Sequence, residues 1–155
     1  MVGVDLSGAT LTSVELAGLD LTDANLSSVD LSSLSLVNTI LAGANLMGTN
    51  LTGATLLGVT SGGITGTPAA LPTGFVVTAG YLVGPGVNLA GANLTGADLT
   101  GADLTGADLT GVTSGGITGL PAALPAYGIV LVNGYLLGPG VDLTGADLAG
   151  AALAG

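Results

Sequence analysis

Leucine recurs at every fifth residue through the first third of the chain, and this spacing restricts the fold more than any other feature. The run begins at Leu6 and reaches Leu56 without a miss. A period of five matches neither the 3.6-residue turn of an α-helix nor the two-residue repeat of a β-strand, so one continuous element would scatter the leucines around its surface. A chain that turns a corner every five residues would instead bring every leucine to a common axis. The pattern therefore predicts a solenoid, in which stacked repeats build the core.

The pentads return in two later blocks, Leu89 to Leu109 and Leu143 to Leu153. The residue two before each Leu is small or apolar, and the residue directly before it is mostly Asp, Asn, Ser or Thr. Units such as Ala24-Asn25-Leu26 and Ala97-Asp98-Leu99 resemble the pentapeptide-repeat family, and the motif covers 95 of the 155 residues. The resemblance implies an all-β fold, a right-handed quadrilateral parallel β-helix with four pentads per coil. The Leu and the residue two before it would point inward.

Two copies of a longer element separate the pentad blocks. One five-residue side of the coil is called a face. Each copy begins with a face that has Ser at its centre, as in Val59-Thr60-Ser61, and Phe75 to Leu82 has the spacing of two further faces. The stretches 64–74 and 117–128 hold two prolines each, so we expect them to leave the coil as loops. The chain is interpreted as one domain, 1–155, with pentads at 4–58, a first insert at 59–86, pentads at 87–111, a second insert at 112–140 and pentads at 141–155.

The number of faces predicts where the two loop insertions lie. Three faces per insert and five pentads make eight faces, or two full coils, so both loops would project from the same corner, roughly 10 Å apart at the spacing of neighbouring strands. The whole chain would form about six coils and roughly 30 Å of rod. If 64–74 contains another face, the two loops would instead lie a quarter turn apart.

The two loops are the candidate interaction surfaces, because they are apolar and interrupted by proline. They would either contact a protein partner or fold back on the rod as a side wall. The candidate residues are Ile64, Pro68, Leu71, Pro72, Ile117, Leu120, Pro121, Leu124, Pro125 and Tyr127.

The pentad pattern runs into both ends of the sequence without a helix, a proline stop or a charged cap. A bare coil end exposes unpaired backbone groups and apolar side chains. Either the sequence is a piece of a longer array, or end-to-end stacking covers these coils, and head-to-tail contacts that do not close produce filaments. The candidate stacking residues are Val4, Leu6, Ala151 and Leu153.

All ten charged side chains are acidic, and the formal net charge is −10. With no Lys or Arg, the chain has no side chain that could neutralise nucleic-acid phosphates or bind an anionic membrane surface. With no His or Cys, it lacks the usual general base near neutral pH, Ser-His and Cys-His nucleophile pairs, and His/Cys metal sites. We therefore predict no enzymatic activity, no cofactor and no metal.

Nine of the ten carboxylates directly precede a Leu, which indicates a structural register rather than a site. Residues twenty apart should stack, and the first block then keeps its carboxylates apart, as in the column Asp5-Asn25-Asn45. The face count also stacks Asp108 over Asp142, an arrangement that a Ca²⁺ ion could bridge. It further places Tyr81, Asp103 and Tyr135 in one column.

The most consistent interpretation is a structural rod that associates with itself head to tail or forms part of a longer array. The alternatives are a protein-binding scaffold, a DNA mimic that binds topoisomerases, as the resemblance implies for some members, and an ice-binding solenoid. Residues 31–97 carry no charge, which disfavours mimicry, and only Thr12-Ser32-Thr52 forms a short hydroxyl ladder. No long apolar span or basic leader is present, so we expect no transmembrane segment or signal peptide; a soluble or extracellular assembly fits.

Overall fold

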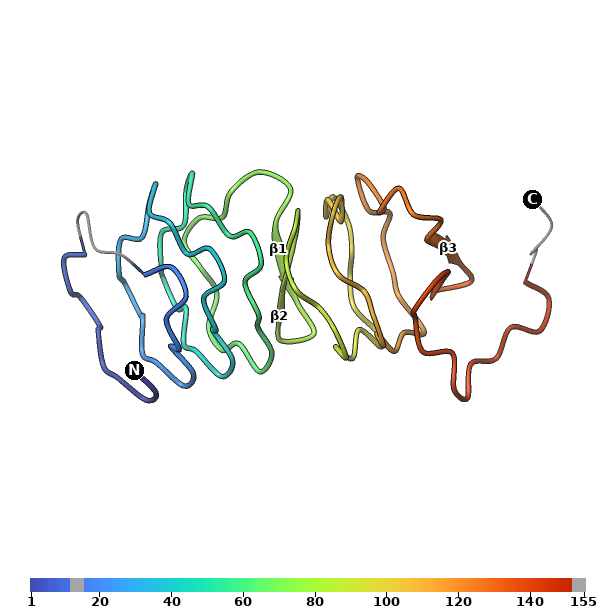
Figure 1. The fold of residues 1–155 in the computed structure, drawn as a ribbon, viewed down its shortest axis with the longest axis horizontal. Coiled ribbons are helices and arrows are strands. Elements are labelled where there is room, and N and C mark those ends of the chain that lie inside the picture. Colours follow the sequence, from blue (N-terminus) through green and yellow to red (C-terminus); the bar gives the residue numbers. More distant parts are fainter. Residues whose placement is uncertain (12–15, 152–155) are drawn as a thin grey trace.

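Parallel backbone pairing between residues twenty apart organises the computed structural model, which describes residues 1–11 and 16–151 (Figure 1). Asp5 pairs with Asn25, Asn25 with Asn45, and Asn45 with Thr65. Each paired residue precedes the inward position of its pentad, and the next N–H continues the ladder; for example, Leu6 N donates to the carbonyl of Asn25 at 2.9 Å. Four pentads therefore make one coil, and the coils stack into the rod of Figure 1.

The corners of the regular pentads are closed by a short backbone hydrogen bond, such as that from Ala9 N to the carbonyl of Leu6 at 2.9 Å. The corner residue two after the Leu adopts a positive φ, which explains why glycine is common there; Gly8 has a φ of 66°. Asp23 occupies the same kind of corner with a φ of 57°. Aspartate tolerates this conformation better than most residues, so the one carboxylate outside the Leu-preceding position also has a structural explanation.

The inward positions build the core, as the spacing predicts. Ala24 and Leu26 are both fully buried, and the same pair of positions is buried in successive coils. Thr39 and Thr49 also occupy inward positions with no exposed area, and their hydroxyls donate to the carbonyls of Leu16 and Leu26 at 2.8 Å each. These hydroxyls are therefore satisfied without water.

The proline-containing stretches belong to the coil, so the prediction that 64–74 and 117–128 leave it as loops is wrong. Thr65 pairs with Asn45 and Ala70 with Asn50, which continues the five-residue step from Thr60. In the second insert, Thr118 pairs with Asp98 and Ala123 with Asp103. Pro72 and Pro125 are compatible with this path because both directly follow the Leu position. In regular pentads the N–H of that residue bonds to a side chain, as Ser7 N does to Asp5 Oδ1, and not to the backbone ladder.

The two stretches predicted as coil faces after the prolines form antiparallel hairpins instead. Strand β1, Val76–Thr78, pairs with β2, Tyr81–Val83, and strand β3, Val130–Val132, pairs with β4, Tyr135–Leu137. The turn residues Ala79-Gly80 and Asn133-Gly134 share φ values of 49° and 78°. Positive φ at both central residues is typical of the type I′ turn, whose twist matches that of the flanking strands.

The first hairpin divides the core of the rod into two clusters. Val77 and Leu82 pack against the cluster built by the coils before it. Val76, Tyr81 and Val83 pack against the cluster built by the coils after it. Alternate residues of a strand point to opposite faces, so one hairpin contacts both cores, and Figure 1 shows β1 and β2 between the two groups of coils.

Each insert contributes four faces, three in the coil and one taken by the hairpin, so the two hairpins lie a quarter turn apart. Thr60 pairs with Asn88 across the first insert, whereas Thr113 pairs with Asp142 across the second. The same-corner prediction is therefore wrong, and the quarter-turn arrangement of the alternative is the one observed, although 64–74 contains two faces rather than one and Phe75 to Leu82 forms one hairpin rather than two faces. The predicted stacking of Asp108 over Asp142 is also wrong, because Asp142 pairs with Thr113.

The predicted column of Tyr81, Asp103 and Tyr135 is likewise wrong. Both tyrosines belong to hairpin strands, and Asp103 pairs with Ala123. Within residues 1–11 and 16–151, no helix is long and apolar enough to cross a membrane.

Candidate interaction surfaces

The first hairpin is fixed to the coil before it by two hydrogen bonds. Leu82 N donates to Ser61 Oγ at 3.0 Å, and Ile64 N donates to the carbonyl of Gly80 at 2.9 Å. Ser61 is 8% exposed and occupies the position where other pentads have Leu. The serine therefore supplies an acceptor to an amide of the hairpin, which a leucine in the same place could not do.

The other side of the first hairpin is covered by the coil that follows it. In the regular stack, the N–H of the residue before Leu donates to a carbonyl of the preceding coil, as Asn25 N does to Val4 at 2.9 Å. In the covering coil, Asn93 N donates to the Tyr81 hydroxyl at 3.2 Å and Asp98 N to Thr78 Oγ1 at 3.0 Å. Hairpin side chains thus replace the backbone acceptors of a missing coil.

A third hydrogen bond extends this contact, from Asp103 N to the carbonyl of Gly74 at 2.8 Å. The apolar surface between the hairpin and the covering coil is closed, since Val83 is fully buried and Leu89 is 2% exposed. The contact is a complete head-to-tail joint between two modules of the same chain.

The second hairpin repeats these contacts. Leu136 N donates to Ser114 Oγ at 3.0 Å, and Ile117 N donates to the carbonyl of Gly134 at 3.0 Å. On the other side, Asp147 N donates to the Tyr135 hydroxyl at 3.2 Å. The duplicated sequence therefore repeats the serine and tyrosine contacts of the joint, whereas Val132 stands in the place of Thr78 and has no hydroxyl that could accept an amide.

The second joint is less covered than the first. Val130 is 49% exposed, whereas its counterpart Val76 is half-buried. Leu143 is 38% exposed, whereas its counterpart Leu89 is 2% exposed. The residue that corresponds to Asp98 of the first joint is Ala152, which lies outside the described residues, so the exposure of Val130 and Leu143 does not by itself mark an open surface.

Most of the candidate loop residues lie in the wall or core of the rod rather than on an outward loop. Ile64 and Ile117 are 8% and 7% exposed, and Leu71 and Leu124 pack against the two core clusters. Leu120 is 81% exposed, and Tyr127 is 46% exposed with its hydroxyl donating to the carbonyl of Ala107 at 2.9 Å. The prolines are half-buried or buried: Pro68, Pro72, Pro121 and Pro125.

The candidate end-stacking residues lie at opposite ends of the rod where the structure describes them. Val4 and Leu6 are half-buried and pack against the first core cluster. Ala151 is half-buried near the other end, and Leu153 lies outside the described residues.

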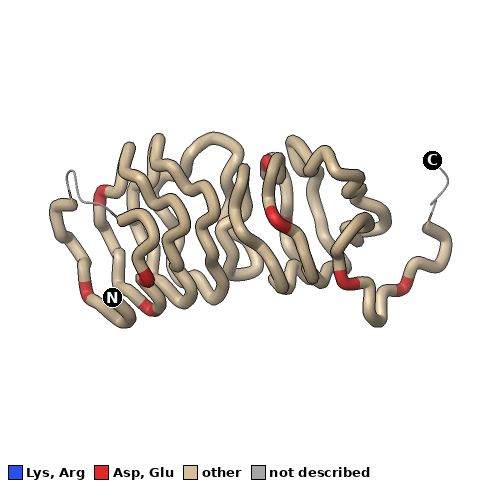
Figure 2. Tube along the Cα trace, viewed as in Figure 1, with Lys and Arg blue, Asp and Glu red and all other residues tan. Residues whose placement is uncertain are grey.

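Eight carboxylates each accept the N–H of the residue two positions ahead, and Figure 2 shows the acidic residues at separate places on the trace. Asp20 is representative: Thr22 donates to Oδ1 through its hydroxyl at 2.6 Å and its N–H at 3.0 Å, and these bonds lower the pKa of the carboxyl from 3.8. In the part of the chain that the structure describes, no three potential ligands gather as a metal site. These acids stabilise pentad turns.

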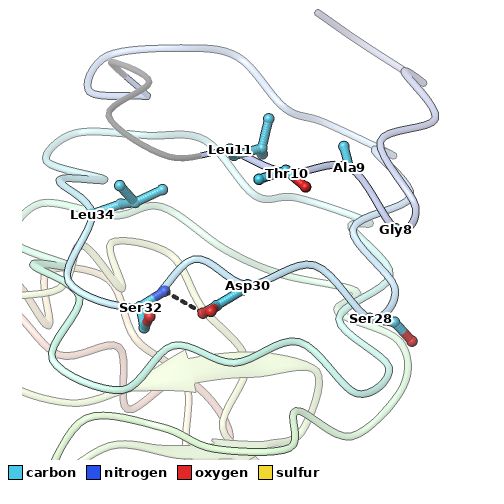
Figure 3. Close-up of a pocket in the computed structure, with 8 residues that line it drawn as sticks. All are labelled: Gly8, Ala9, Thr10, Leu11, Ser28, Asp30, Ser32 and Leu34. Carbon is cyan, nitrogen blue, oxygen red and sulfur yellow. Dashed lines mark hydrogen bonds between the residues drawn. The ribbon is translucent and has the colours of Figure 1, made fainter.

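One hollow in the first coils has a volume of about 350 Å³ and is drawn in Figure 3. Its one charged lining group is Asp30, whose Oδ1 accepts the N–H of Ser32 at 3.0 Å. A single carboxylate already bound to backbone offers no acid–base pair. The lining residues are Gly8, Ala9, Thr10, Leu11, Ser28, Asp30, Ser32 and Leu34.

The hydroxyl groups that connect hairpin and coil were not predicted from the sequence. A signal for the hairpins was present in the second insert, where Asn133-Gly134 separates two apolar runs, and this dipeptide strongly favours a two-residue hairpin turn. The first insert has Ala79-Gly80 at the same place, a weaker signal. The roles of Ser61 and Tyr81 follow only when the hairpin is placed across the rod.

Comparison with known proteins agrees with the repeat pattern. The family model for pentapeptide repeats matches eight copies, over residues 1–27, 24–60 and 85–113, more than half of the chain. No curated protein matches this chain.

Two solved structures are similar to this chain in sequence, but they superpose on it only to a limited extent. HetL, a pentapeptide repeat protein involved in heterocyst differentiation regulation in the cyanobacterium Nostoc sp. strain PCC 7120, is 26% identical with a TM-score of 0.29; the match covers 77% of this chain and 56% of HetL. Rfr23, a pentapeptide repeat protein from the cyanobacterium Cyanothece 51142, is 29% identical with a TM-score of 0.28, over 79% and 88% of the two chains. From the family model and its repeats, the chain belongs to the pentapeptide repeat family.

Proposed function

We propose that the protein is a non-enzymatic structural rod that associates with itself end to end. The observation that carries this proposal is the joint at the first hairpin. There, one module of the chain stacks on the next with a closed apolar surface and three hydrogen bonds to the covering coil. A surface that accepts a module of the same chain is suited to accept a module of another copy.

The inventory of side chains supports a structural role over a catalytic one. The sequence contains no His, Lys, Arg or Cys, so no serine has a basic partner that would activate it. The carboxylates with lowered pKa values hold the turn two residues ahead, as Asp98 does for Thr100. These groups favour the charged form and would be poor general acids near neutral pH.

The binding-scaffold alternative has less support. Its premise was a pair of outward loops on one side of the rod, and the two segments instead pair within the coil and lie a quarter turn apart. A DNA mimic needs a continuous acidic surface, whereas residues 31–97 carry no charge. For ice binding, the described part of the ladder is Ser32 and Thr52, because Thr12 lies outside the described residues.

Sedimentation velocity over a hundredfold range of protein concentration, combined with electron microscopy, tests the proposal. We expect the sedimentation coefficient to rise with concentration and the micrographs to show rods longer than one chain, with a rung repeat of about 4.8 Å in fibre diffraction. A single species of constant sedimentation coefficient, seen as uniform short rods at every concentration, would contradict it.

A further inference from the structure

We propose that the first hairpin is a hinge built into the rod, at which the rod bends in one direction. The coil that covers the hairpin swings away from it on the wall that contains Asp98, while the wall that contains Asn88 stays joined. The movement takes place within one chain, so this inference does not rest on end-to-end association. It is tested at a protein concentration where the chain is monomeric.

One wall of the rod keeps its backbone pairing across the first insert. Thr60 pairs with Asn88, and Asn88 N donates to the carbonyl of Val59 at 2.9 Å. The chain also passes from the hairpin into the next coil beside this wall, through residues 84–88. We call the wall of Thr60 and Asn88 the hinge wall, because both the ladder and the chain itself hold it together.

The wall opposite the hinge wall has lost this pairing. Asn88, Asn93 and Asp98 lie in consecutive faces, so Asp98 lies two faces beyond Asn88, on the other side of the four-sided coil. Asp98 pairs with Thr118 of the following coil, but among the described residues it has no backbone pairing on the side of the hairpin. On that side, Asp98 N donates to Thr78 Oγ1 at 3.0 Å. We call the wall of Asp98 the opening wall.

The opening wall is held by fewer hydrogen bonds than a regular contact between coils. A face of the first coils has three backbone hydrogen bonds to the next coil, for example those from Leu6 N to Asn25, from Asn25 N to Val4 and from Gly8 N to Ser27. Within residues 16–151, the opening wall has one hydrogen bond to the hairpin in place of these three, and its acceptor is a side chain. A side-chain hydroxyl can rotate away without disturbing the neighbouring ladder, so this wall opens more easily than a regular face.

The core is also divided at the level of the hairpin, which Figure 1 shows between two groups of coils. Val77 packs against the apolar cluster before the hairpin, whereas Val76 and Val83 pack against the cluster after it. The hairpin stays with the coil before it, because Leu82 N donates to Ser61 Oγ at 3.0 Å. A bend between the hairpin and the covering coil therefore leaves the packing inside the first cluster unchanged. It alters only the contacts on the other side of the hairpin.

The covering coil contains its own matched probes of this movement. Asp98 and Asp108 lie in identical Gly-Ala-Asp-Leu-Thr pentads, so their amides have the same intrinsic rate of hydrogen exchange. Asp98 N is bonded to the hairpin hydroxyl, whereas Asp108 N donates to the carbonyl of Val87 at 3.0 Å in the regular ladder. We expect exchange, measured by NMR, to be about tenfold or more faster at Asp98 than at Asp108. Equal rates, or an Asn88 amide that exchanges as fast as that of Asp98, would overturn the hinge.

The substitution Thr78→Val tests whether the covering coil moves as one body. The variant removes the acceptor of Asp98 N but preserves the shape of the side chain, and the second insert has Val132 at the same place in its hairpin. Asn93 retains its own acceptor, the Tyr81 hydroxyl at 3.2 Å. In a hinge, exchange at Asn93 should nevertheless become roughly threefold or more faster, together with exchange at Asp98, while the amide on the hinge wall changes by less than about twofold.

Thr52→Val is the matched control, because Thr52 is exposed on the opening wall in a regular coil before the insert. This variant should leave the exchange rates at Asn88, Asn93 and Asp98 within about twofold of the unmodified chain. Circular dichroism melts establish that both variants are folded, and the comparison of Asp98 with Asp108 in the unmodified chain needs no variant. Acceleration confined to Asp98 in Thr78→Val would show that the bonds break independently, and equal acceleration at Asn88 would show that the whole coil detaches. Either result contradicts the hinge.

Distances between spin labels test the direction of the bend. The chain has no Cys, so labels attach only at introduced cysteines. Thr52→Cys with Thr100→Cys spans the joint along the opening wall, and Ala42→Cys with Ala90→Cys spans it along the hinge wall. We expect a broader distance distribution for the first pair than for the second, and further broadening of the first pair when Thr78→Val is added. Equal widths for the two pairs, or a broader distribution on the hinge wall, would refute the proposed direction.

Discussion

Replacing Ser61 by leucine restores the consensus residue at that position of the pentad, and we expect it to destabilise the protein. A reading of the repeat alone predicts the opposite, because leucine occupies the equivalent position in most coils and is fully buried there, as in Leu41. The difference arises from the hairpin. Ser61 Oγ accepts the N–H of Leu82 at 3.0 Å, and both residues lie inside the rod at 8% and 0% exposure.

The size of the effect follows from these contacts. Ser61→Ala leaves the buried Leu82 amide without its acceptor, which costs about 1–3 kcal/mol in the free energy of unfolding. Ser61→Leu adds the cost of forcing a larger side chain against the hairpin, a further ~1–3 kcal/mol. A chain of this size loses roughly 2–4 °C of melting temperature per kcal/mol. Ser61→Ala should therefore lower the melting temperature by several degrees, and Ser61→Leu by more.

Thermal and urea unfolding of Ser61→Ala, Ser61→Leu and Ser35→Ala measures the effect at a protein concentration where the chain is monomeric. Ser35 is exposed on the outer wall, so its alanine variant should stay within about 0.5 kcal/mol of the unmodified chain. Ser114→Ala should reproduce the Ser61→Ala loss, because Ser114 Oγ accepts Leu136 N at 3.0 Å. A Ser61→Leu variant as stable as the unmodified chain or more stable would refute the placement of the hairpin across the rod.

Three further predictions concern the coil itself. Gly66→Ala and Gly101→Ala share the strain of a positive φ, 71° and 73°, but a Cβ at position 66 would lie 2.6 Å from the backbone nitrogen of Met47, whereas a Cβ at position 101 would have no atom within 4 Å. Urea unfolding should therefore show Gly66→Ala to be less stable than Gly101→Ala by a further ~1–3 kcal/mol. Equal losses in the two variants would contradict the packing at Gly66. Thr39→Val should change stability by less than about 1 kcal/mol, since the carbonyl of Leu16 keeps the hydrogen bond from Leu19 N at 3.1 Å, and a large loss would show that the hydroxyl is indispensable. The folded-state pKa of several aspartates lies below the 3.8 of the unfolded chain, because the Ser or Thr two residues ahead donates hydrogen bonds to the carboxylate. The stabilisation from these carboxylates is present above pH ~4 and is lost as the pH falls through the lowered pKa values. The melting temperature should therefore fall between about pH 5 and pH 2.5, and a constant or rising melting temperature would refute this prediction. These aspartates are Asp5, Asp20, Asp30, Asp98, Asp103, Asp108 and Asp142.

The regular part of the rod could be predicted from local spacing, because the position of a residue within its pentad determines its role in the coil. Leu26 and Ala24 point inward, Asn25 joins the ladder and the corner residue takes a positive φ, and all of this depends on the residue's place within five. The predicted column Asp5-Asn25-Asn45 is confirmed by the backbone pairing. Stacking adds side-chain bonds that follow the same register, such as Asn25 Nδ2 to Asp5 Oδ1 at 3.1 Å.

The inserts were harder, because proline suggested loops where the five-residue step in fact continued. Thr60, Thr65 and Ala70 are five apart, and each takes part in the ladder. Proline breaks a ladder only where its missing N–H would have been used, and Pro72 stands where it is not. A stricter reading of the step would have placed these faces and, with them, the quarter turn between the two modules.

The sequence by itself determined the period of the coil, the residues that fill it and the separation of its carboxylates, because these properties repeat within five residues. The tertiary structure decided the path of Phe75 to Leu82 and of its copy in the second insert. Alternating apolar residues suit either an outer face of the coil or a hairpin inside it, since both bury every second side chain. The choice depends on groups distant in the chain, Ser61 on one side and Asn93 on the other, whose hydrogen bonds to Leu82 and Tyr81 exist only once the coils enclose the hairpin.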